Sequence, residues 1–352
     1  MKRMISALAA LILMMSLAIL PAAAEEKETV RVGALSMLNM TEEEMSKFLT
    51  VRAMIVNQLV QEKQAASLRK TDDNIPNFEV QFYDSLESMV MGLIAGEIKA
   101  FTVYQTTAQY LCANNEQLVQ VNAFEEENPS LFASLMLNGP MANDFSFMMM
   151  ESNTELRDEF NAAIEELKTD DAGTLLKIMT EQILTPISGE EIIPVQMPVI
   201  EGAPTIRVAV TGALPPMDYV APDGTPAGYT TAVLAEISKK INKNIELVVV
   251  DALGRATALA SGNVDVVFWT RTSSAADEVA RQIAEPDEET IDAISTTLTD
   301  EQMAIFQQFI NTLDFASYGK ADMPEGTIIT KPYYSDQLVM VGRQEDVQQA
   351  AQ

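Results

Sequence analysis

The chain has 352 residues, 47% of them hydrophobic and 21% charged, which excludes disorder as the dominant state and suits two domains. Its formal net charge of −28 would repel nucleic acid and anionic lipid, so we expect no nucleic-acid partner. The sequence contains no histidine, which excludes Ser-His and Cys-His nucleophile pairs and His-built zinc sites; we expect neither a metal nor another cofactor.

The first predicted element is an export signal over residues 1–24. Lys2 and Arg3 precede an apolar run from Ile5 to Leu20, and small residues stand before Glu25, as at an Ala-x-Ala cleavage site. The run is short for a membrane span, although an uncleaved anchor is the alternative. We therefore expect an extracytoplasmic protein, periplasmic or secreted, with its signal peptide cleaved.

Strand and helix patterns then alternate over residues 25–184. Apolar and β-branched runs predict strands, and apolar residues at helical spacing predict the helices between them. The predicted strands are 29–35, 78–84, 98–103 and 144–150, and the predicted helices include 85–96, 106–115 and 173–184. Ser152 and Glu155 form a capping box for another helix. The lone cysteine, Cys112, lies in an apolar helical stretch and is interpreted as a buried, inert thiol.

Residues 185–204 contain four prolines and two glycines, and we interpret them as a linker to a second part, 205–352. Alternation then resumes, with an acidic helical insertion at 273–330 and a loop at 212–228 that turns at Pro222-Asp223-Gly224. The predicted strands are 205–210, 245–251, 264–269 and 336–342, and the predicted helices are 229–241 and 252–262. Such alternation indicates mainly parallel sheets with helices on both faces.

The two parts repeat one another. Residues 29–35, TVRVGAL, match 205–211, TIRVAVT, and residues 80–103 match 247–269, each as strand, Asp, helix, Gly and strand. Ligands bind beyond the carboxyl ends of parallel strands, so two facing lobes would form a clamp that closes about a hinge. A tandem duplication with two independent sites is the alternative.

The second part resembles the periplasmic solute-binding proteins of family 3. The matching pieces are IRVAV, LPPMDYVAPDGTPAGY and DALGRATALASGNVDVVF, while KPYYSDQLVMV resembles the segment that crosses between the family's lobes. Residues 29–184 resemble the family's second lobe, through DSLESMVMGLIAGEIKAFTVYQTTAQYLCANN. The resemblance implies an α/β fold of two Rossmann-like lobes joined by a hinge, as in type 2 periplasmic binding proteins.

The lobes stand in the reverse of the family's usual order, which suggests a circular permutation. The closing strand at Val339–Val341 should then approach Thr29–Val32 near the hinge, because permutation requires neighbouring termini. By resemblance, we expect a monomer that captures a small polar solute, amino-acid-like or a carboxylate, for the membrane permease of an ABC transporter.

The expected ligand-binding residues follow the strands of both parts. The family holds a ligand carboxylate with hydroxyls after the third strand and an Arg several residues further on. The resemblance assigns the hydroxyl roles to Thr270 and Thr272 and the cation role to Arg271, with Arg281 as the other candidate. Trp269 is interpreted as an aromatic wall of the pocket, with burial in the core as the alternative. This chain lacks the carboxylate that the family places near Tyr104, so an anion or a neutral solute fits equally well. The other expected contacts are Thr211, Leu214, Asp218, Tyr219, Met37, Asn39, Tyr104 and Gln105.

Two other functions stay open from the sequence. Some proteins of this fold are dehydratases or cleave peptidoglycan; without histidine, the candidate acids or bases are Asp218 and Asp84, and neither lies in a catalytic motif. A sensory or partner-binding module is the other alternative, with 273–330 as its contact. We expect a binding protein without catalytic residues.

Overall fold

The computed structural model describes residues 29–35, 41–43, 45–46, 49–50, 77–121, 142–189, 191–251, 254–272 and 324–350. The expected signal at 1–24, most of the 273–330 insertion, Met37 and Asn39 lie outside these residues. Within the described part of the chain, no helix combines the length and hydrophobicity needed to cross a membrane.

Ten of the described strands form one large sheet, whose two halves have the same arrangement of strands. In one half the strand order is β2-β1-β3-β13-β4, and in the other it is β10-β6-β11-β5-β12. In each half, the first three strands of this order pair in parallel. The fourth strand, β13 or β5, pairs antiparallel with the third, and the fifth strand, β4 or β12, pairs antiparallel with the fourth. The internal repeat predicted from the sequence is therefore present in the strand order.

The bounds of the predicted strands agree with the structure to within a few residues, whereas β4 and β12 were not predicted, and β12 lies at the end of the segment 273–330 that was expected to be helical. In the half that we call the N-terminal lobe, the strands are β1 (Thr29–Leu35), β2 (Asn77–Tyr83), β3 (Ala100–Tyr104) and β4 (Leu118–Val121). In the half that we call the central lobe, they are β6 (Thr205–Val210), β10 (Asn244–Val249), β11 (Val266–Thr272) and β12 (Thr327–Ile329).

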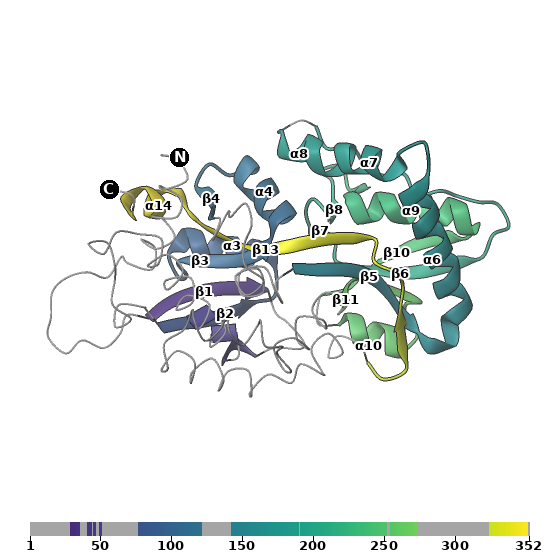
Figure 1. Ribbon diagram of the computed structural model, residues 1–352, viewed down its shortest axis with the longest axis horizontal. Coiled ribbons are helices and arrows are strands. Elements are labelled where there is room, and N and C mark those ends of the chain that lie inside the picture. The colour runs from purple at the N-terminus through teal and green to yellow at the C-terminus, as the bar shows by residue number, and fades with distance from the viewer. Residues whose placement is uncertain are drawn as a thin grey trace, which may run out of the picture.

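Two antiparallel strands connect the lobes. They are β5 (Ala142–Met150) and β13 (Tyr334–Arg343), which pair through 142–145 and 334–337. Beyond that pairing, β5 continues into the central lobe, and β13 continues into the N-terminal lobe, as Figure 1 shows with β13 in yellow. This is the pair of crossings on which a hinge between two lobes depends.

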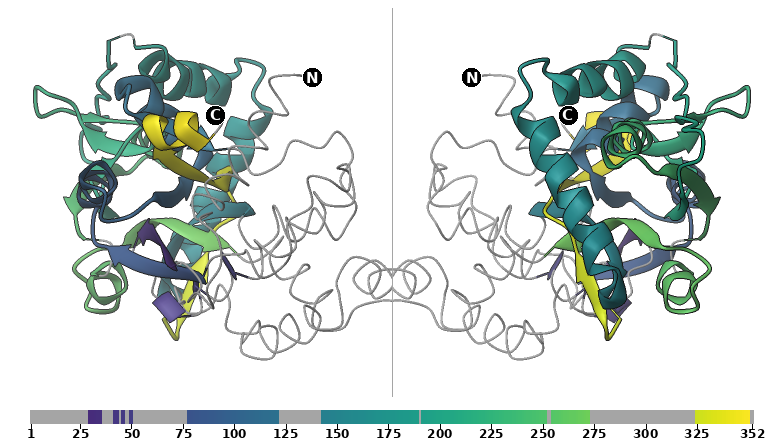
Figure 2. Two further views of the ribbon diagram at one scale, coloured as in Figure 1. Left: turned by 90° about the vertical axis from the view of Figure 1, so that its left-hand side faces the viewer. Right: turned by 90° about the vertical axis from the view of Figure 1, so that its right-hand side faces the viewer.

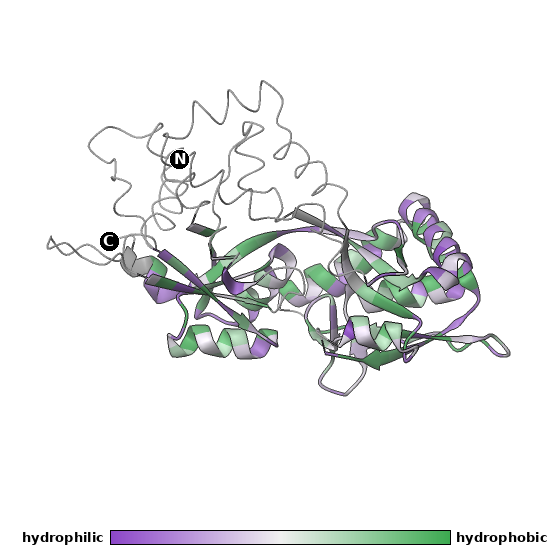
Figure 3. Cartoon of the chain, turned by 90° about the horizontal axis from the view of Figure 1, so that it is seen from below, coloured by the Kyte–Doolittle hydropathy of each residue, from purple (hydrophilic) through white to green (hydrophobic). Residues whose placement is uncertain are grey.

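Helices cover both halves of the sheet. The N-terminal lobe has α3 (Leu86–Ala95), α4 (Gln105–Asn114) and α14 (Gln344–Ala350). The central lobe has α6 (Thr154–Thr169), α7 (Thr174–Met179), the π-helical turn η4 (Thr180–Leu184), α8 (Thr185–Ile187), α9 (Tyr229–Ile241) and α10 (Arg255–Ala260). In the right-hand view of Figure 2, the teal helix α6 lies across the outer end of the central lobe. Figure 3 shows hydrophobic stretches concentrated in the strands, whereas the helices alternate along their length, as amphipathic helices do.

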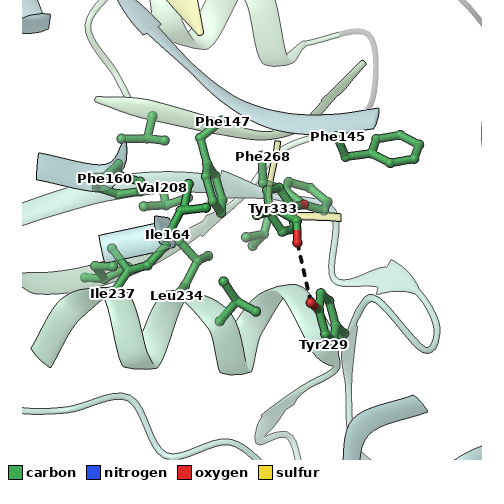
Figure 4. Close-up of a cluster of buried hydrophobic side chains, with 14 of the residues drawn as sticks. Phe145, Phe147, Phe160, Ile164, Val208, Tyr229, Leu234, Ile237, Phe268 and Tyr333 are labelled. Atoms are coloured by element: carbon green, nitrogen blue, oxygen red, sulfur yellow. Dashed lines mark hydrogen bonds between the residues drawn. The ribbon is translucent and has the colours of Figure 1, made fainter. Parts of the chain in front are cut away.

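The boundary between the two lobes does not lie at 185–204, where the sequence analysis placed it. Phe145, Phe160 and Ile183 belong to the same buried core as Val208 and Phe268 (Figure 4), so β5 and α6 to η4 are part of the central lobe. The reason is the amphipathic stripe of α6, which packs against α9 rather than on the N-terminal sheet. A separate core around Leu93 and Phe101 stabilises the N-terminal lobe.

The proline-rich segment lies along the central lobe instead of spanning between lobes. Val195 donates its backbone N–H to Pro226, and Ile200 donates to the side chain of Asn244, both at 2.7 Å. The Asn244 amide donates in return to the carbonyls of Ile200 and Ala203, at 3.0 and 3.1 Å. This segment joins α8 to β6 within one lobe.

Three further details differ from the expectations. The strand β13 does not pair with β1, because Val339 and Val341 pair with β3, which lies between the two strands; the permuted lobe order stays a prediction. The expected loop at 212–228 contains a small sheet of β7 (Ala213–Leu214), β8 (Asp218–Val220) and β9 (Pro226–Ala227), with the predicted turn between β8 and β9. The capping box at Ser152 does not form, because the 3-10 turn η3 (Glu151–Asn153) precedes α6.

Candidate functional site

The carboxyl ends of the parallel strands in both lobes meet where β5 and β13 cross. Leu35 ends β1 and Tyr104 ends β3, and both side chains pack against the core of the central lobe. From the other side, β11 ends at Thr272, which pairs with Asp144 in the N-terminal half of β5. Ligands of parallel α/β sheets bind at such strand ends, so we take this junction as the candidate site.

A row of aromatic rings occupies the junction. Tyr104 meets Phe145 edge to face with ring centroids 4.8 Å apart, and Phe145 lies 6.4 Å from Tyr334. Tyr229, at the start of α9, lies 5.0 Å from Tyr334. Phe145 and Tyr229 are buried, whereas Tyr104 and Tyr334 are half-buried. The rings thus come from β3, β5, β13 and α9, with two of them reaching solvent.

A carboxylate from the crossing strand lies beside these rings. The Asp336 Oδ2 accepts the Thr106 backbone N–H at 3.1 Å and the Tyr334 hydroxyl at 3.4 Å, and Oδ1 accepts the Gln337 N–H at 2.7 Å. The Tyr334 and Thr106 hydroxyls share a further hydrogen bond. Burial raises the pKa of Asp336 above the ordinary carboxyl value, and the hydrogen bonds from Thr106 and Gln337 oppose that shift. We call Tyr104, Thr106, Phe145, Tyr334 and Asp336 the junction cluster.

The Asp336 carboxylate of β13 also caps the N-terminus of α4, although it is distant from that helix in the sequence. The N-cap residue of α4 is Tyr104, whose side chain makes no capping hydrogen bond. Thr106 lies in the first turn, where backbone N–H groups have no partner within the helix. The expected ligand residue Gln105 is likewise engaged, because its side-chain oxygen accepts a hydrogen bond from Gln337 of β13.

A second group of expected residues surrounds Asp218 on the central lobe. Asp218 is 2% exposed, and its Oδ2 accepts the backbone N–H groups of Thr211 and Gly212 at 2.6 and 2.8 Å and the Thr211 hydroxyl at 2.8 Å. Burial raises the pKa of this carboxyl, and the same hydrogen bonds oppose the shift. The geometry gives Asp218 the task of holding the turn after β6.

Tyr219 and Leu214 stand on the same small sheet. Leu214 packs into the core of the central lobe, while the Tyr219 ring lies 6.1 Å from that of Tyr110 on α4, across the two lobes. Burial, with a smaller contribution from Tyr110, raises the pKa of Tyr219 to about 12. Asn114 at the end of α4 donates its amide to the Pro186 carbonyl at 3.4 Å, so α4 touches the central lobe in two places.

The residues expected after the third strand of the central lobe belong to the strand itself. The backbone of Trp269, Thr270, Arg271 and Thr272 continues β11, because 270–272 pair with 144–146 of β5. Thr270 is 3% exposed and lies opposite Ser146. The strand extends three residues beyond the predicted end at 269, because its partner strand β5 comes from a distant part of the sequence.

The sequence analysis missed Asp336, Tyr334 and Thr106. A carboxylate and two tyrosines inside the strand-like run KPYYSDQLVMV were the available signal, because an acidic residue within an apolar strand needs a local partner. Cys112 agrees with its interpretation: it is partly buried, and burial raises the pKa of its thiol to about 11. Within the described residues, no three His, Cys, Asp or Glu side chains gather as metal ligands.

Comparison with known proteins places one segment in a family. Residues 206–302 match the model of the bacterial extracellular solute-binding proteins, family 3, which covers just over a quarter of the chain. The match begins at β6 and includes the Asp218 turn, α9 and all of β11. It confirms, for this segment, the resemblance seen in the sequence. No curated protein matches the chain.

Three solved structures are similar over most of the chain. The ligand-binding component of an ABC-type import system from Staphylococcus aureus, with zinc bound, is 9% identical over 92% of this chain and 71% of its own, with a TM-score of 0.38. An ancestral arginine-binding protein bound to arginine is 12% identical over 92% and 91%, with a TM-score of 0.36. A phosphate-binding protein of a phosphate ABC transporter from Streptococcus pneumoniae is 8% identical over 91% and 94%, with a TM-score of 0.33. Because these TM-scores are all below 0.5, no argument about fold or function rests on them.

Proposed function

We propose, from the family 3 segment at 206–302, that the chain is an extracytoplasmic solute-binding protein that captures a small polar solute between its lobes for an ABC importer. One observation carries the proposal: β11 of this segment ends at the crossing strand β5, and β3 of a second lobe with the same strand order ends beside the crossing strand β13, which pairs with β5. Two matching lobes on a pair of crossings favour a clamp over two independent sites.

Binding without chemical conversion fits the residues at the junction. The acid that the sequence singled out, Asp218, accepts three hydrogen bonds from its own turn and is 2% exposed, so it is poorly placed to exchange protons with a solute. The aromatic rings of the junction cluster provide apolar walls, and the half-buried polar groups beside them provide orientation, which is the composition of small-molecule sites. We further propose a monomer exported through the cleaved signal at 1–24.

A ligand screen on the purified chain starting at Glu25 tests the function. Ligands that bind only the folded state stabilise it by mass action, by about 2.7 kcal/mol at a hundredfold excess over the dissociation constant. We expect one class among amino acids, amines, carboxylates and sugars to raise Tm, and calorimetry to give one ligand per chain with the ligand recovered unchanged. Turnover of the ligand, or no stabilisation by any class, would contradict the proposal.

A further inference from the structure

The Asp336 carboxylate is half-buried at the junction, and none of the described residues provides it with a positive partner. Among the described residues, no Lys or Arg forms an ion pair with it; the pairs on the central lobe and on β13 join other residues, such as Arg343 with Asp346. Its hydrogen bonds come from an N–H of α4, a neighbouring N–H and a tyrosine hydroxyl. A carboxylate removed from water without a cation is unfavourable, so a cationic partner would relieve it.

The surroundings of Asp336 suit a cation for a second, independent reason. Four aromatic rings form an unbroken row, Tyr104 to Phe145 to Tyr334 to Tyr229, with centroid separations of 4.8, 6.4 and 5.0 Å, and within this row the Tyr334 hydroxyl donates to Asp336 at 3.4 Å. The faces of such rings attract ammonium and guanidinium groups, by about 0.5 to 2 kcal/mol each depending on desolvation. The formal net charge of −28 favours the approach of cations as well.

Solvent can reach the carboxylate. Asp336, Tyr104, Gln105 and Tyr334 keep partial exposure, and the buried rings of Phe145 and Tyr229 lie behind them. Because Asp336 lies on a crossing strand and bonds to the start of α4, a solute held there would contact the N-terminal lobe and the hinge together.

We propose that Asp336 recognises a cationic group of the captured solute, an ammonium or a guanidinium, and that the rings of Tyr104 and Tyr334 flank that group. This inference rests on the proposed function and names its substrate class: a solute with a positively charged group and no requirement for a second charge. It departs from the expectation that the ligand is recognised through a carboxylate held by Arg271.

Calorimetry with defined probes tests the inference. The cationic probes are L-arginine, L-lysine, putrescine and choline; L-glutamate and succinate are the anionic probes, and L-glutamine and glucose carry no net charge. We expect at least one cationic probe to bind the wild-type chain. The substitution Asp336→Asn keeps an oxygen for the Thr106 N–H and removes the charge; it should weaken that probe about 30-fold or more, since the removed group is the partner of a desolvated cation.

A matched control is Asp171→Asn in the exposed turn between α6 and α7, outside the junction cluster. This variant loses the same charge and should bind within about twofold of wild type, because salt screens an exposed charge beyond about 10 Å. If Asp336→Asn fails to fold, Tyr104→Leu is the second variant, with an expected loss of about fivefold to tenfold for the cationic probe.

The outcomes separate the inference from the function. Binding of only anionic or uncharged probes would overturn the cation assignment and leave the solute-binding function standing. Unchanged affinity of the cationic probe in both Asp336→Asn and Tyr104→Leu would also overturn it. Failure of all probes to bind would remove the proposed function and the inference together.

Discussion

Replacing Asp218 by Ala tests whether this residue holds the turn after β6 or contacts the solute. Its Oδ2 accepts three hydrogen bonds, from the Thr211 N–H, the Thr211 hydroxyl and the Gly212 N–H, at 2.6 to 2.8 Å. Each hydrogen bond to a charged group contributes about 1.5 to 3 kcal/mol, but Thr211 and Gly212 are half-buried and water replaces part of what they lose. The cost of desolvating the carboxylate offsets a further part of the hydrogen-bond energy, so we expect Asp218→Ala to lower the free energy of unfolding by about 3 kcal/mol.

Urea unfolding followed by circular dichroism measures this loss. The control Asp218→Asn keeps one acceptor oxygen and removes the charge, so it should lose only about 1 kcal/mol. If Asp218 held the turn, ligand affinity in Asp218→Asn would stay near that of wild type. A free energy of unfolding for Asp218→Ala within about 0.5 kcal/mol of wild type, together with lost ligand binding, would refute the structural assignment.

The stability of the wild-type chain and of Asp218→Asn can also be compared as a function of pH. Burial raises the native pKa of Asp218, so the folded chain holds this proton at pH values where the unfolded chain has released it. The contribution of Asp218 to stability therefore falls as pH rises from the ordinary carboxyl value through the raised native pKa. The advantage of wild type over Asp218→Asn should be largest at the acidic end of that window and shrink above it. An advantage that grows with pH would contradict the sign.

Three other perturbations follow from the packing. Gln182→Ala removes a buried amide that donates to a carbonyl at 3.0 Å and accepts the Gly228 N–H at 2.9 Å; it should lose about 2 kcal/mol in urea unfolding, against almost none for the exposed Gln117→Ala. Gly228→Ala would place Cβ 2.5 Å from a backbone oxygen at a φ of 108° and should lower the free energy of unfolding by about 3 kcal/mol or more. The control Gly224→Ala, at a φ of 86° with no atom near the added Cβ, should lower it by about 1 kcal/mol. Equal losses in the two variants would exclude the steric cause. Cys112, with a pKa of about 11, should react slowly with iodoacetamide at pH 8 until urea unfolds the chain, and fast labelling of the folded protein would show an accessible thiolate.

Local sequence patterns predicted most of the helices and strands, because neighbouring residues determine where a helix ends and where a turn forms. The helix ending at Gly96 does so in a left-handed conformation that glycine adopts readily, and the turn at Asp223 and Gly224 forms between β8 and β9 as its residues predict. The repeat of strand, Asp, helix, Gly and strand predicted that the two parts are alike, and both lobes have the same order of their three parallel strands.

The contacts that define the junction could not be predicted in the same way. Asp336 and Thr106 are separated by 230 residues, and nothing in either local sequence indicates that one caps the helix of the other. The division between lobes was misplaced for a related reason. The prolines in 185–204 indicate a mostly irregular segment, which begins with the short helix α8, but they do not indicate where the segment lies; hydrogen bonds to Asn244 hold it on the central lobe.

The claim that two lobes close on a solute is tested most directly by a distance between them. Spin labels at the exposed positions Glu87 on α3 and Lys239 on α9, in a Cys112→Ser background, report on the two lobes separately. Pulsed electron resonance should show the distance distribution displaced and narrowed when the bound probe is saturating. A distribution that is identical with and without a probe shown by calorimetry to occupy the chain would contradict closure.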